Sequence, residues 1–168
     1  GIPLDAAAEA KPGDEKTMFS AHSFGAVFAE VRVDPWLQVV RIPRIVGTYD
    51  VGTRLNAKTA ESQLRGGMVW GVGLAMTEES LLDLGTGHFA NASLAEYHVP
   101  VNADIGELDV TFIDAPDTNF NPLGIRGIGE IGITGVAAAL CNAIWYATGV
   151  HVRDLPMTID KLMTRVCT

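Results

Sequence analysis

Cysteine is scarce in this sequence. Its two cysteines, Cys141 and Cys167, belong to no C-x-x-C pair, and two thiols are too few for a disulfide framework. An iron–sulfur cluster needs several thiolate ligands, so this chain alone cannot hold one. The four histidines are scattered, and no two of them lie at the i, i+4 spacing that places two imidazoles on one helix face. The sequence therefore predicts no metal ligands of its own.

Positive charge is also scarce. Lysine and arginine number 12 against 20 aspartates and glutamates, which gives a formal net charge of -8. The sequence has no basic run and no series of aromatic residues, whereas a protein that neutralises phosphates needs clustered lysine and arginine. We therefore expect no nucleic-acid partner.

The N-terminal residues lack the charged and then apolar pattern of a signal peptide. One long uncharged run is present, the 20 residues from Ile131 to Val150, and it is long enough to span a bilayer. This run contains three glycines and an asparagine, and much of the rest is alanine. We therefore expect a helix buried in a soluble protein rather than a membrane span. Both the cytoplasm and the periplasm remain open as its compartment.

The apolar content is sufficient for a core, because 48% of the residues are hydrophobic and 19% are charged. This balance argues against wholesale disorder. Residues 1–18 are rich in alanine, glycine, proline and charge and have no hydrophobic period, so we expect a flexible tail or linker there. Residues 19–168 then form one domain or a part of a larger one.

Two β-rich segments, Phe24–Val33 and Leu37–Tyr49, flank the turn signal Asp34-Pro35 and predict a hairpin. Residues 107–113 alternate between apolar and polar side chains and predict a further strand. A long helix is expected from about Gly129 to about Thr148. The elements show no regular βαβ alternation, so the predicted fold class is α+β, a mixed sheet with packed helices.

The helix expected between the hairpin and the next strand is rich in glycine. Asn56 or Thr59 can cap its start, and apolar residues recur at helical spacing between positions 64 and 75. Glycines stand at positions 66, 67, 71 and 73, and each weakens a helix by about 1 kcal/mol relative to alanine. They indicate that another backbone or a ligand packs very close, and contact between helices explains them at least as well as a ligand does.

A glycine-rich segment immediately precedes the expected long helix. Gly127–Gly132 fits the pattern G-x-G-x-x-G, which in dinucleotide-binding folds follows a strand and is followed about 20 residues later by an acidic residue. Here Pro122 disfavours a central strand upstream, and Asp154 stands in a loop-like context. Too little chain remains for a βαβ unit. A dinucleotide-binding oxidoreductase fragment that uses Gly127–Gly132 is therefore kept as an alternative.

Glu130 lies inside this segment, at the expected start of the helix. Glycines let a backbone approach a ligand closely, and free N–H groups at a helix start attract anions. A carboxylate there also opposes the helix dipole, which stabilises a helix by about 0.3–1 kcal/mol. Spacing alone leaves both a catalytic and a structural role open for Glu130. A further alternative is a non-catalytic interaction module whose glycine-rich helices pack against a partner protein.

Several blocks of the sequence resemble, in the expected order, the molybdenum-binding large subunits of the xanthine dehydrogenase/aldehyde oxidase family. The blocks are FGAVFAEVRVD, SQLRGGMVWGVGLAMTEE, EYHVP, the string Gly127-Ile128-Gly129-Glu130, and GVAAALCNAIWYATGVHVRDLP. The resemblance covers about residues 19–165 and looks closest to the large subunit of bacterial periplasmic aldehyde oxidoreductases. It implies that residues 19–168 are the C-terminal portion of a molybdopterin-binding domain of the xanthine oxidase type.

The resemblance also implies roles for individual residues. Glu130 matches the family's catalytic glutamate, which would act as base on a metal-bound hydroxide while an aldehyde or a purine-like N-heterocycle is oxidised with water-derived oxygen. The positions that match cofactor-binding segments are Thr53, Arg54, Leu55, Asn56, Ala57, Lys58, Thr59, Gln63, Arg126, Gly127, Ile128 and Gly129. Lys58 and a capped helix start suit the cofactor's phosphates, and Gln63 can both donate to and accept from its polar edge.

The cofactor implied is molybdopterin, as molybdopterin cytosine dinucleotide, with iron–sulfur clusters and FAD on partner subunits or domains. The partners implied are the remainder of the molybdenum subunit, an iron–sulfur subunit and an FAD subunit. The family's molybdenum subunit is several times longer than 168 residues, and its earlier cofactor loops have no counterpart in this sequence. We therefore expect this chain by itself to bind no cofactor and to be inactive.

Overall fold

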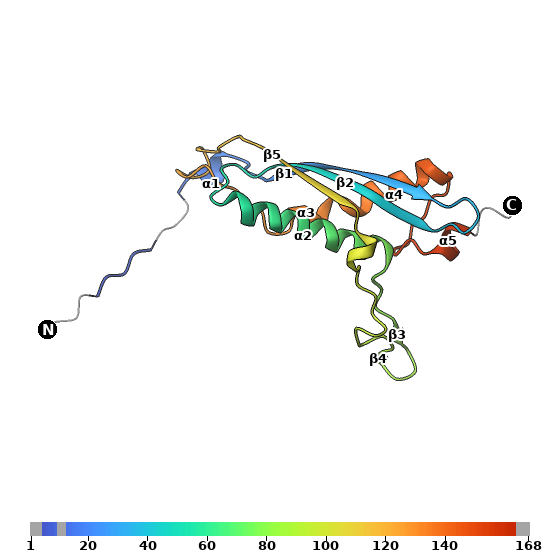
Figure 1. Ribbon diagram of the computed structural model, residues 1–168. Helices are drawn as coiled ribbons and strands as arrows, with labels where there is room; N and C mark the ends of the chain where they lie inside the picture. Colours follow the sequence, from blue (N-terminus) through green and yellow to red (C-terminus); the bar gives the residue numbers. More distant parts are fainter. Residues whose placement is uncertain (1–4, 10–12, 164–168) are drawn as a thin grey trace.

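The computed structural model describes residues 5–9 and 13–163, whose body is a sheet with helices packed on it (Figure 1). β1 (Phe24–Val33) pairs antiparallel with β2 (Val40–Asp50), and β2 pairs in parallel with β5 (Glu107–Ile113). The three-stranded sheet has the order β1-β2-β5 and is therefore mixed. The predicted α+β class is confirmed.

The predicted hairpin is confirmed, although β2 begins later than expected. Residues 37–39 belong to the connecting loop, because Val33 already pairs with Val40. Asp34 organises this loop, since its Oδ1 accepts the backbone N–H groups of Trp36 and Leu37 at 2.8 Å each. These two hydrogen bonds lower the pKa of the Asp34 carboxyl below its ordinary value.

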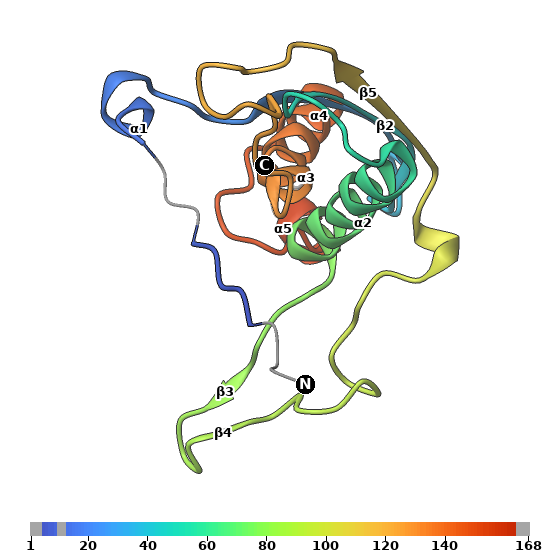
Figure 2. The ribbon, with the colours of Figure 1, turned by 90° about the vertical axis from the view of Figure 1, so that its left-hand side faces the viewer.

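Two helices cover one face of the sheet, which curves over them in end view (Figure 2). They are α2 (Ala57–Met76) and α4 (Val136–Thr148). Of the two caps predicted for α2, Asn56 is the one used, and its side chain accepts the N–H of Thr59 at 3.2 Å. The buried core between sheet and helices includes Ile45, Tyr49, Leu64, Met68, Val72, Val136, Leu140 and Ile144.

The glycines of α2 mark close contact between helices. A Cβ atom added to Gly67 would lie 2.8 Å from the Cα of Gly132, and one added to Gly71 would lie 2.5 Å from the Cβ of Val136. By contrast, a Cβ on Gly66 would meet nothing within 4 Å. Packing of one helix on another therefore explains the glycines at positions 67 and 71 without a ligand.

The helix predicted from about Gly129 to about Thr148 is present, but it is interrupted at Gly135. α3 (Ile131–Thr134) ends there and α4 begins at the next residue. A Cβ on Gly135 would lie 2.9 Å from the Cγ2 of Val27, so the break falls where the chain passes close to β1. The C-terminal end agrees with expectation, because Gly149 ends α4 with a φ of 72°.

One stretch in the described part of the chain, Ile131–Thr148, is apolar and long enough to cross a membrane by length and composition. It comprises both α3 and α4, so the break at Gly135 interrupts it. Three of its side chains, those of Val136, Leu140 and Ile144, lie in the buried core. Only 22% of the stretch is buried inside the described chain, so the expected core helix stays a prediction.

Three shorter parts complete the fold (Figure 1). An arm projects from the body between α2 and η1 (Asn102–Asp104), and it carries the small antiparallel pair β3 (Leu82–Asp83) and β4 (His88–Phe89). α5 (Ile159–Met163) follows α4. The tail holds α1 (Glu15–Met18), which the sequence analysis did not predict. Residues 1–4 and 10–12 and Cys167 lie outside the described residues, so the flexibility expected for residues 1–18 stays a prediction.

Candidate functional site

A hollow of about 530 Å³ lies at the N-terminal end of α2. Its wall comes from the stretch after β2, from the first turns of α2 and from the loop that precedes α3. The lining residues are Val51, Thr53, Arg54, Leu55, Asn56, Thr59, Ala60, Gln63, Ile125, Arg126, Ile128 and Gly129. The structure thus brings together the two segments that the sequence singled out, which lie far apart along the chain.

Four of the predicted site residues do not line this hollow. Ala57 and Lys58 are exposed in the first turn of α2. Gly127 is exposed in the glycine-rich loop, and Glu130 is exposed one residue beyond the lining. Lys58 therefore lies between the lining residues Asn56 and Thr59 in the sequence, but it does not itself line the hollow.

Backbone pairing holds the two segments together just after β2. The N–H of Thr53 donates to the carbonyl of Gly124 at 2.8 Å, and the N–H of Arg126 donates to the carbonyl of Val51 at 2.9 Å. Gly52, with a φ of 70°, lies so close to the loop that an added Cβ would be 2.2 Å from the carbonyl oxygen of Gly124. A glycine is needed there for both its backbone conformation and its small size.

Arg126 is fixed by two carboxylates that the sequence did not point to. Its guanidinium donates to Asp50, and it lies 3.4 Å from Asp117. The side chains of Arg126 and Asp50 are 11% and 7% exposed, so this ion pair is largely shielded from water. The hydrogen bond from Arg126 lowers the pKa of the Asp50 carboxyl. The Nε of Arg126 is buried and has no hydrogen-bond partner in the described chain.

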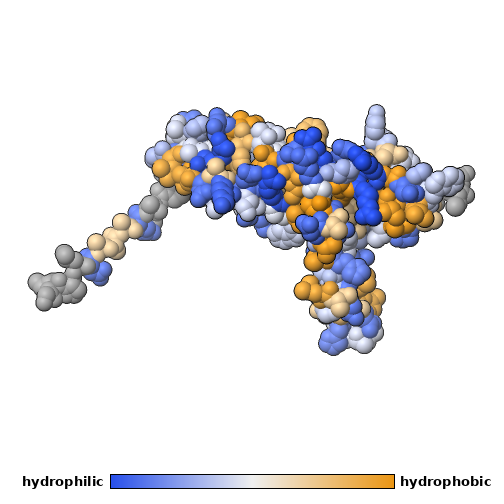
Figure 3. Space-filling view, viewed as in Figure 1, coloured by the Kyte–Doolittle hydropathy of each residue, from blue (hydrophilic) through white to orange (hydrophobic). Residues whose placement is uncertain are grey.

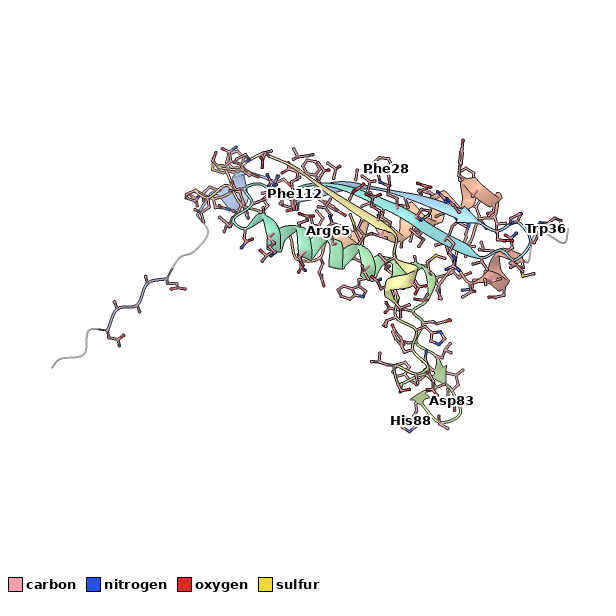
Figure 4. The ribbon with its side chains drawn as sticks, in the orientation of Figure 1. Phe28, Trp36, Arg65, Asp83, His88 and Phe112 are labelled. Atoms are coloured by element: carbon pink, nitrogen blue, oxygen red, sulfur yellow. The ribbon has the colours of Figure 1, made fainter. Side chains whose placement is uncertain are left out.

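Arg54, in the stretch between β2 and α2, is held by an acidic residue that directly follows β5. Its Nη2 contacts both carboxylate oxygens of Asp114, at 3.0 and 3.1 Å. The guanidinium also lies 4.9 Å from the ring centroid of Phe112, whose place on β5 is labelled in Figure 4. Since both arginines of the hollow have acidic partners, the wall offers oriented donors rather than a large surplus of positive charge.

The glycine-rich loop is held by side chains from two other parts of the chain. Gln63 Nε2 donates to the carbonyl of Gly129 at 2.5 Å, and Ser23 Oγ donates to the carbonyl of Gly127. A Cβ on either glycine would meet nothing within 4 Å, so the loop faces open space. Ser23 was not predicted as a site residue, and no sequence pattern connects it with the loop.

Glu130 stands at the position before α3 and makes no side-chain capping hydrogen bond there. Its backbone carbonyl accepts the N–H of Ile133 at 3.2 Å. No hydrogen bond or ion pair from the Glu130 carboxylate occurs in the described part of the chain. Glu130 is thus an exposed carboxylate without an internal ion pair in the described chain, one residue beyond the lining residue Gly129.

The dinucleotide-binding alternative requires a strand that leads directly into the glycine-rich segment, and on this point it is wrong. No strand leads directly into Gly127, because β5 ends at Ile113 and a loop follows. Between the end of β5 and the glycine-rich loop, the described chain has only an isolated bridge, which pairs Ile125 with Gly52. The strand–turn–helix geometry that such a fingerprint needs is therefore missing.

Comparison with protein families gives a match to the molybdopterin cofactor-binding domain over residues 2–106. This range ends before the glycine-rich loop, so it contains the first lining segment of the hollow but neither Arg126 nor Glu130.

Two curated relatives come from Escherichia coli K12. The molybdenum-binding subunit of an aldehyde oxidoreductase is 41% identical over 148 residues, which are 88% of this chain and 20% of that protein. A putative xanthine dehydrogenase molybdenum-binding subunit is 37% identical over 147 residues, which are 88% of this chain and 19% of that protein. The chain thus spans about a fifth of the length of these relatives.

Two solved structures of aldehyde oxidoreductases are similar in fold to this chain. The aldehyde oxidoreductase from Desulfovibrio gigas superimposes with a TM-score of 0.78 and 28% identity, over 87% of this chain and 16% of that one. The aldehyde oxidoreductase from Desulfovibrio desulfuricans superimposes with a TM-score of 0.76 and 27% identity, over 84% of this chain and 15% of that one.

Proposed function

We propose that this chain forms one wall of the cofactor site in a molybdenum hydroxylase, because it belongs to the molybdopterin cofactor-binding domain family. The family membership confirms the resemblance found in the sequence. The observation that carries the proposal is the hollow beside α2, which both cofactor-matching segments line and at whose edge Glu130 stands. The proposed reaction is the oxidation of an aldehyde or a purine-like N-heterocycle, a range suggested by the names of the two curated relatives.

The residues of the hollow fit a polar, phosphate-bearing cofactor. The first turn of α2 reaches the wall through Asn56, Thr59 and Ala60, and helix N-termini favour phosphate. Arg126 keeps a buried Nε without a partner, which is a donor that a ligand can satisfy after a small shift of the side chain. Arg54 adds further donors. These groups would hold the cofactor, proposed to be molybdopterin cytosine dinucleotide.

Glu130 is proposed as the general base of the reaction. When bound, the cofactor supplies a two-electron redox centre and a water-derived oxygen for the substrate carbon. The Glu130 carboxylate would accept the proton of that water-derived group, a role open to it because it has no internal ion-pair partner in the described chain. The carbonyl groups of Gly127 and Gly129 are already engaged by Ser23 and Gln63, so the loop that carries Glu130 is held in place.

The rest of the assembly follows from the same proposal. This chain spans about a fifth of its curated relatives, so further cofactor contacts and most of the substrate pocket would come from the remainder of the molybdenum subunit. Electrons would leave through iron–sulfur clusters and FAD on partner subunits. The chain by itself is then expected to retain no molybdenum.

Filling the hollow tests this proposal in the complete enzyme, with the molybdenum subunit assembled with its partners. Ala60 lines the hollow and is half-buried, so Ala60→Trp would occupy space that the cofactor needs. We expect molybdenum and pterin per subunit to fall by at least about tenfold, because a pocket must be open to bury most of its ligand.

The matched control is Ala138→Trp, which places the same side chain on an exposed position of α4 away from the hollow. It should retain wild-type molybdenum and pterin and oxidise an aromatic aldehyde or xanthine at the wild-type rate. Circular dichroism verifies that both variants fold. A folded Ala60→Trp enzyme with full molybdenum content would contradict the proposed site.

A further inference from the structure

The glycine-rich loop is fastened at two alternate carbonyls. Gln63 on α2 holds the carbonyl of Gly129. Ser23, in the segment that leads into β1, holds the carbonyl of Gly127 from a position 104 residues away in the sequence. Gln63 also lines the hollow, whereas Ser23 does not. Ser23 therefore touches the site only through the loop.

Between these two points the Ile128 side chain packs against the core, whereas the two glycines that flank it have no steric restraint of their own. Gly127 and Gly129 are exposed, and added Cβ atoms would meet nothing within 4 Å, so steric contact does not fix their backbone. Glycine also has the widest choice of backbone conformations. Within the described chain, the nearest backbone hydrogen bonds are those of Arg126 with Val51 on one side and of Ile133 with Glu130 on the other.

The two hydrogen bonds therefore set the peptide planes that lead to Glu130. A trans peptide group is planar, and its C=O and N–H point in opposite directions. When Ser23 holds the Gly127 carbonyl, the N–H of Ile128 must point away from Ser23. When Gln63 holds the Gly129 carbonyl, the direction of the N–H of Glu130 is fixed in the same manner.

We propose that Ser23 is a positioning residue, whose hydroxyl orients the loop so that the Glu130 carboxylate faces the reacting groups. This inference rests on the proposed function, since it takes Glu130 as the base. Ser23 makes no contact with the hollow and so is not expected to contribute to cofactor affinity. Loss of the Ser23 hydroxyl should instead slow the chemical step, because a small misplacement of a catalytic group lowers the reaction rate strongly.

The first test is hydrogen–deuterium exchange of the complete enzyme in its cofactor-free form, read in the peptide that contains Gly127–Thr134. The N–H of Ile133 donates to Glu130 and reports on the end of the loop. We expect Ser23→Ala to speed its exchange by about fivefold, equivalent to about 1 kcal/mol for one hydrogen bond. Ser23→Thr retains the hydroxyl and should restore the slow rate. Ser20→Ala, at an exposed serine outside the loop contacts, should change nothing.

The second test is steady-state kinetics of the cofactor-loaded enzyme. Ser23→Ala should lower kcat by about tenfold or more, with KM, molybdenum content and thermal stability unchanged, and Ser23→Thr should recover kcat. Wild-type exchange and kcat in Ser23→Ala would overturn the proposal. Equal loss in the alanine and threonine variants would also overturn it, as would loss of molybdenum. A Glu130→Gln enzyme with normal kcat would instead refute the base role, while the exchange result still decides whether Ser23 holds the loop.

Discussion

Arg126 is the residue that links the wall of the hollow to the core of the sheet. Its backbone pairs with Val51, and its side chain is anchored by Asp50 at the end of β2 and by Asp117 in the preceding loop. The sequence predicted Arg126 as a site residue but gave no sign of its carboxylate partners. Asp50 lies 76 residues away, and such a contact depends on how the whole chain folds back rather than on a local pattern.

The first prediction concerns the Arg126–Asp50 pair. Asp50→Ala leaves a largely buried guanidinium without its main partner, and we expect the free energy of unfolding to fall by about 3–5 kcal/mol. Glu30→Ala is the matched control, because it removes an exposed partner of Arg32 and should cost at most about 1 kcal/mol. Urea denaturation measures both. An Asp50→Ala loss no larger than that of the control would contradict the anchoring role.

The same pair should show a defined pH dependence. Arg126 lowers the folded-state pKa of Asp50, so ionised Asp50 contributes stability that is fully present above the ordinary aspartate pKa of about 4. That contribution is lost as the pH falls through the lowered pKa of the folded state. The difference in stability between wild type and Asp50→Ala should therefore shrink on acidification.

Among the elements, those with local signals were predicted and those that depend on distant contacts were not. The hairpin follows from its turn residues, and α2 follows from its cap and its apolar spacing. The parallel pairing of β2 with β5 joins strands that α2 and the arm separate, and no local pattern encodes such a partner. The break at Gly135 was not predicted either, and it lies where the chain passes close to Val27 of β1, a contact between residues far apart in the sequence.

A further prediction uses two adjacent glycines of α2. Gly67→Ala would place a Cβ 2.8 Å from the Cα of Gly132, and we expect it to destabilise the fold by about 1–3 kcal/mol through overpacking. Gly66→Ala would place its Cβ in open space and should stabilise the helix by up to about 1 kcal/mol. Thermal unfolding of the two variants distinguishes them. Equal stabilisation by both would show that α2 and α3 are not in close contact.

At the scale of the whole molecule, much apolar surface is left uncovered (Figure 3). Tyr146 on α4 is 89% exposed and Phe28 on β1 is 68% exposed, and both border a groove between these elements. Trp36, 85% exposed, lies at the tip of the hairpin, at the opposite end of the body from Phe112 (Figure 4). This chain spans about a fifth of the length of its curated relatives. Exposed apolar surfaces of this kind are expected where the remainder of a larger subunit packs.

The assembled enzyme is also where the role of Glu130 has to be measured. Sequence spacing alone favoured a dipole-opposing carboxylate, the family resemblance implied the catalytic role, and the family match does not extend to this residue. Glu130 is exposed, directly follows the lining residue Gly129 and makes no side-chain capping hydrogen bond. These observations support the catalytic interpretation, which one substitution can separate from the structural one.

The most direct test is the turnover of a Glu130→Gln variant of the complete, metal-replete enzyme, because glutamine keeps the size of the side chain but cannot act as the base. We predict that kcat falls by about 10²–10⁴-fold, the usual effect of losing a general base, at unchanged molybdenum content and stability. Glu96→Gln, on the exposed arm, should leave kcat as in the wild type. If Glu130 only opposes a helix dipole, Glu130→Gln should instead cost about 0.3–1 kcal/mol of stability with near-normal kcat, and that result would contradict the account.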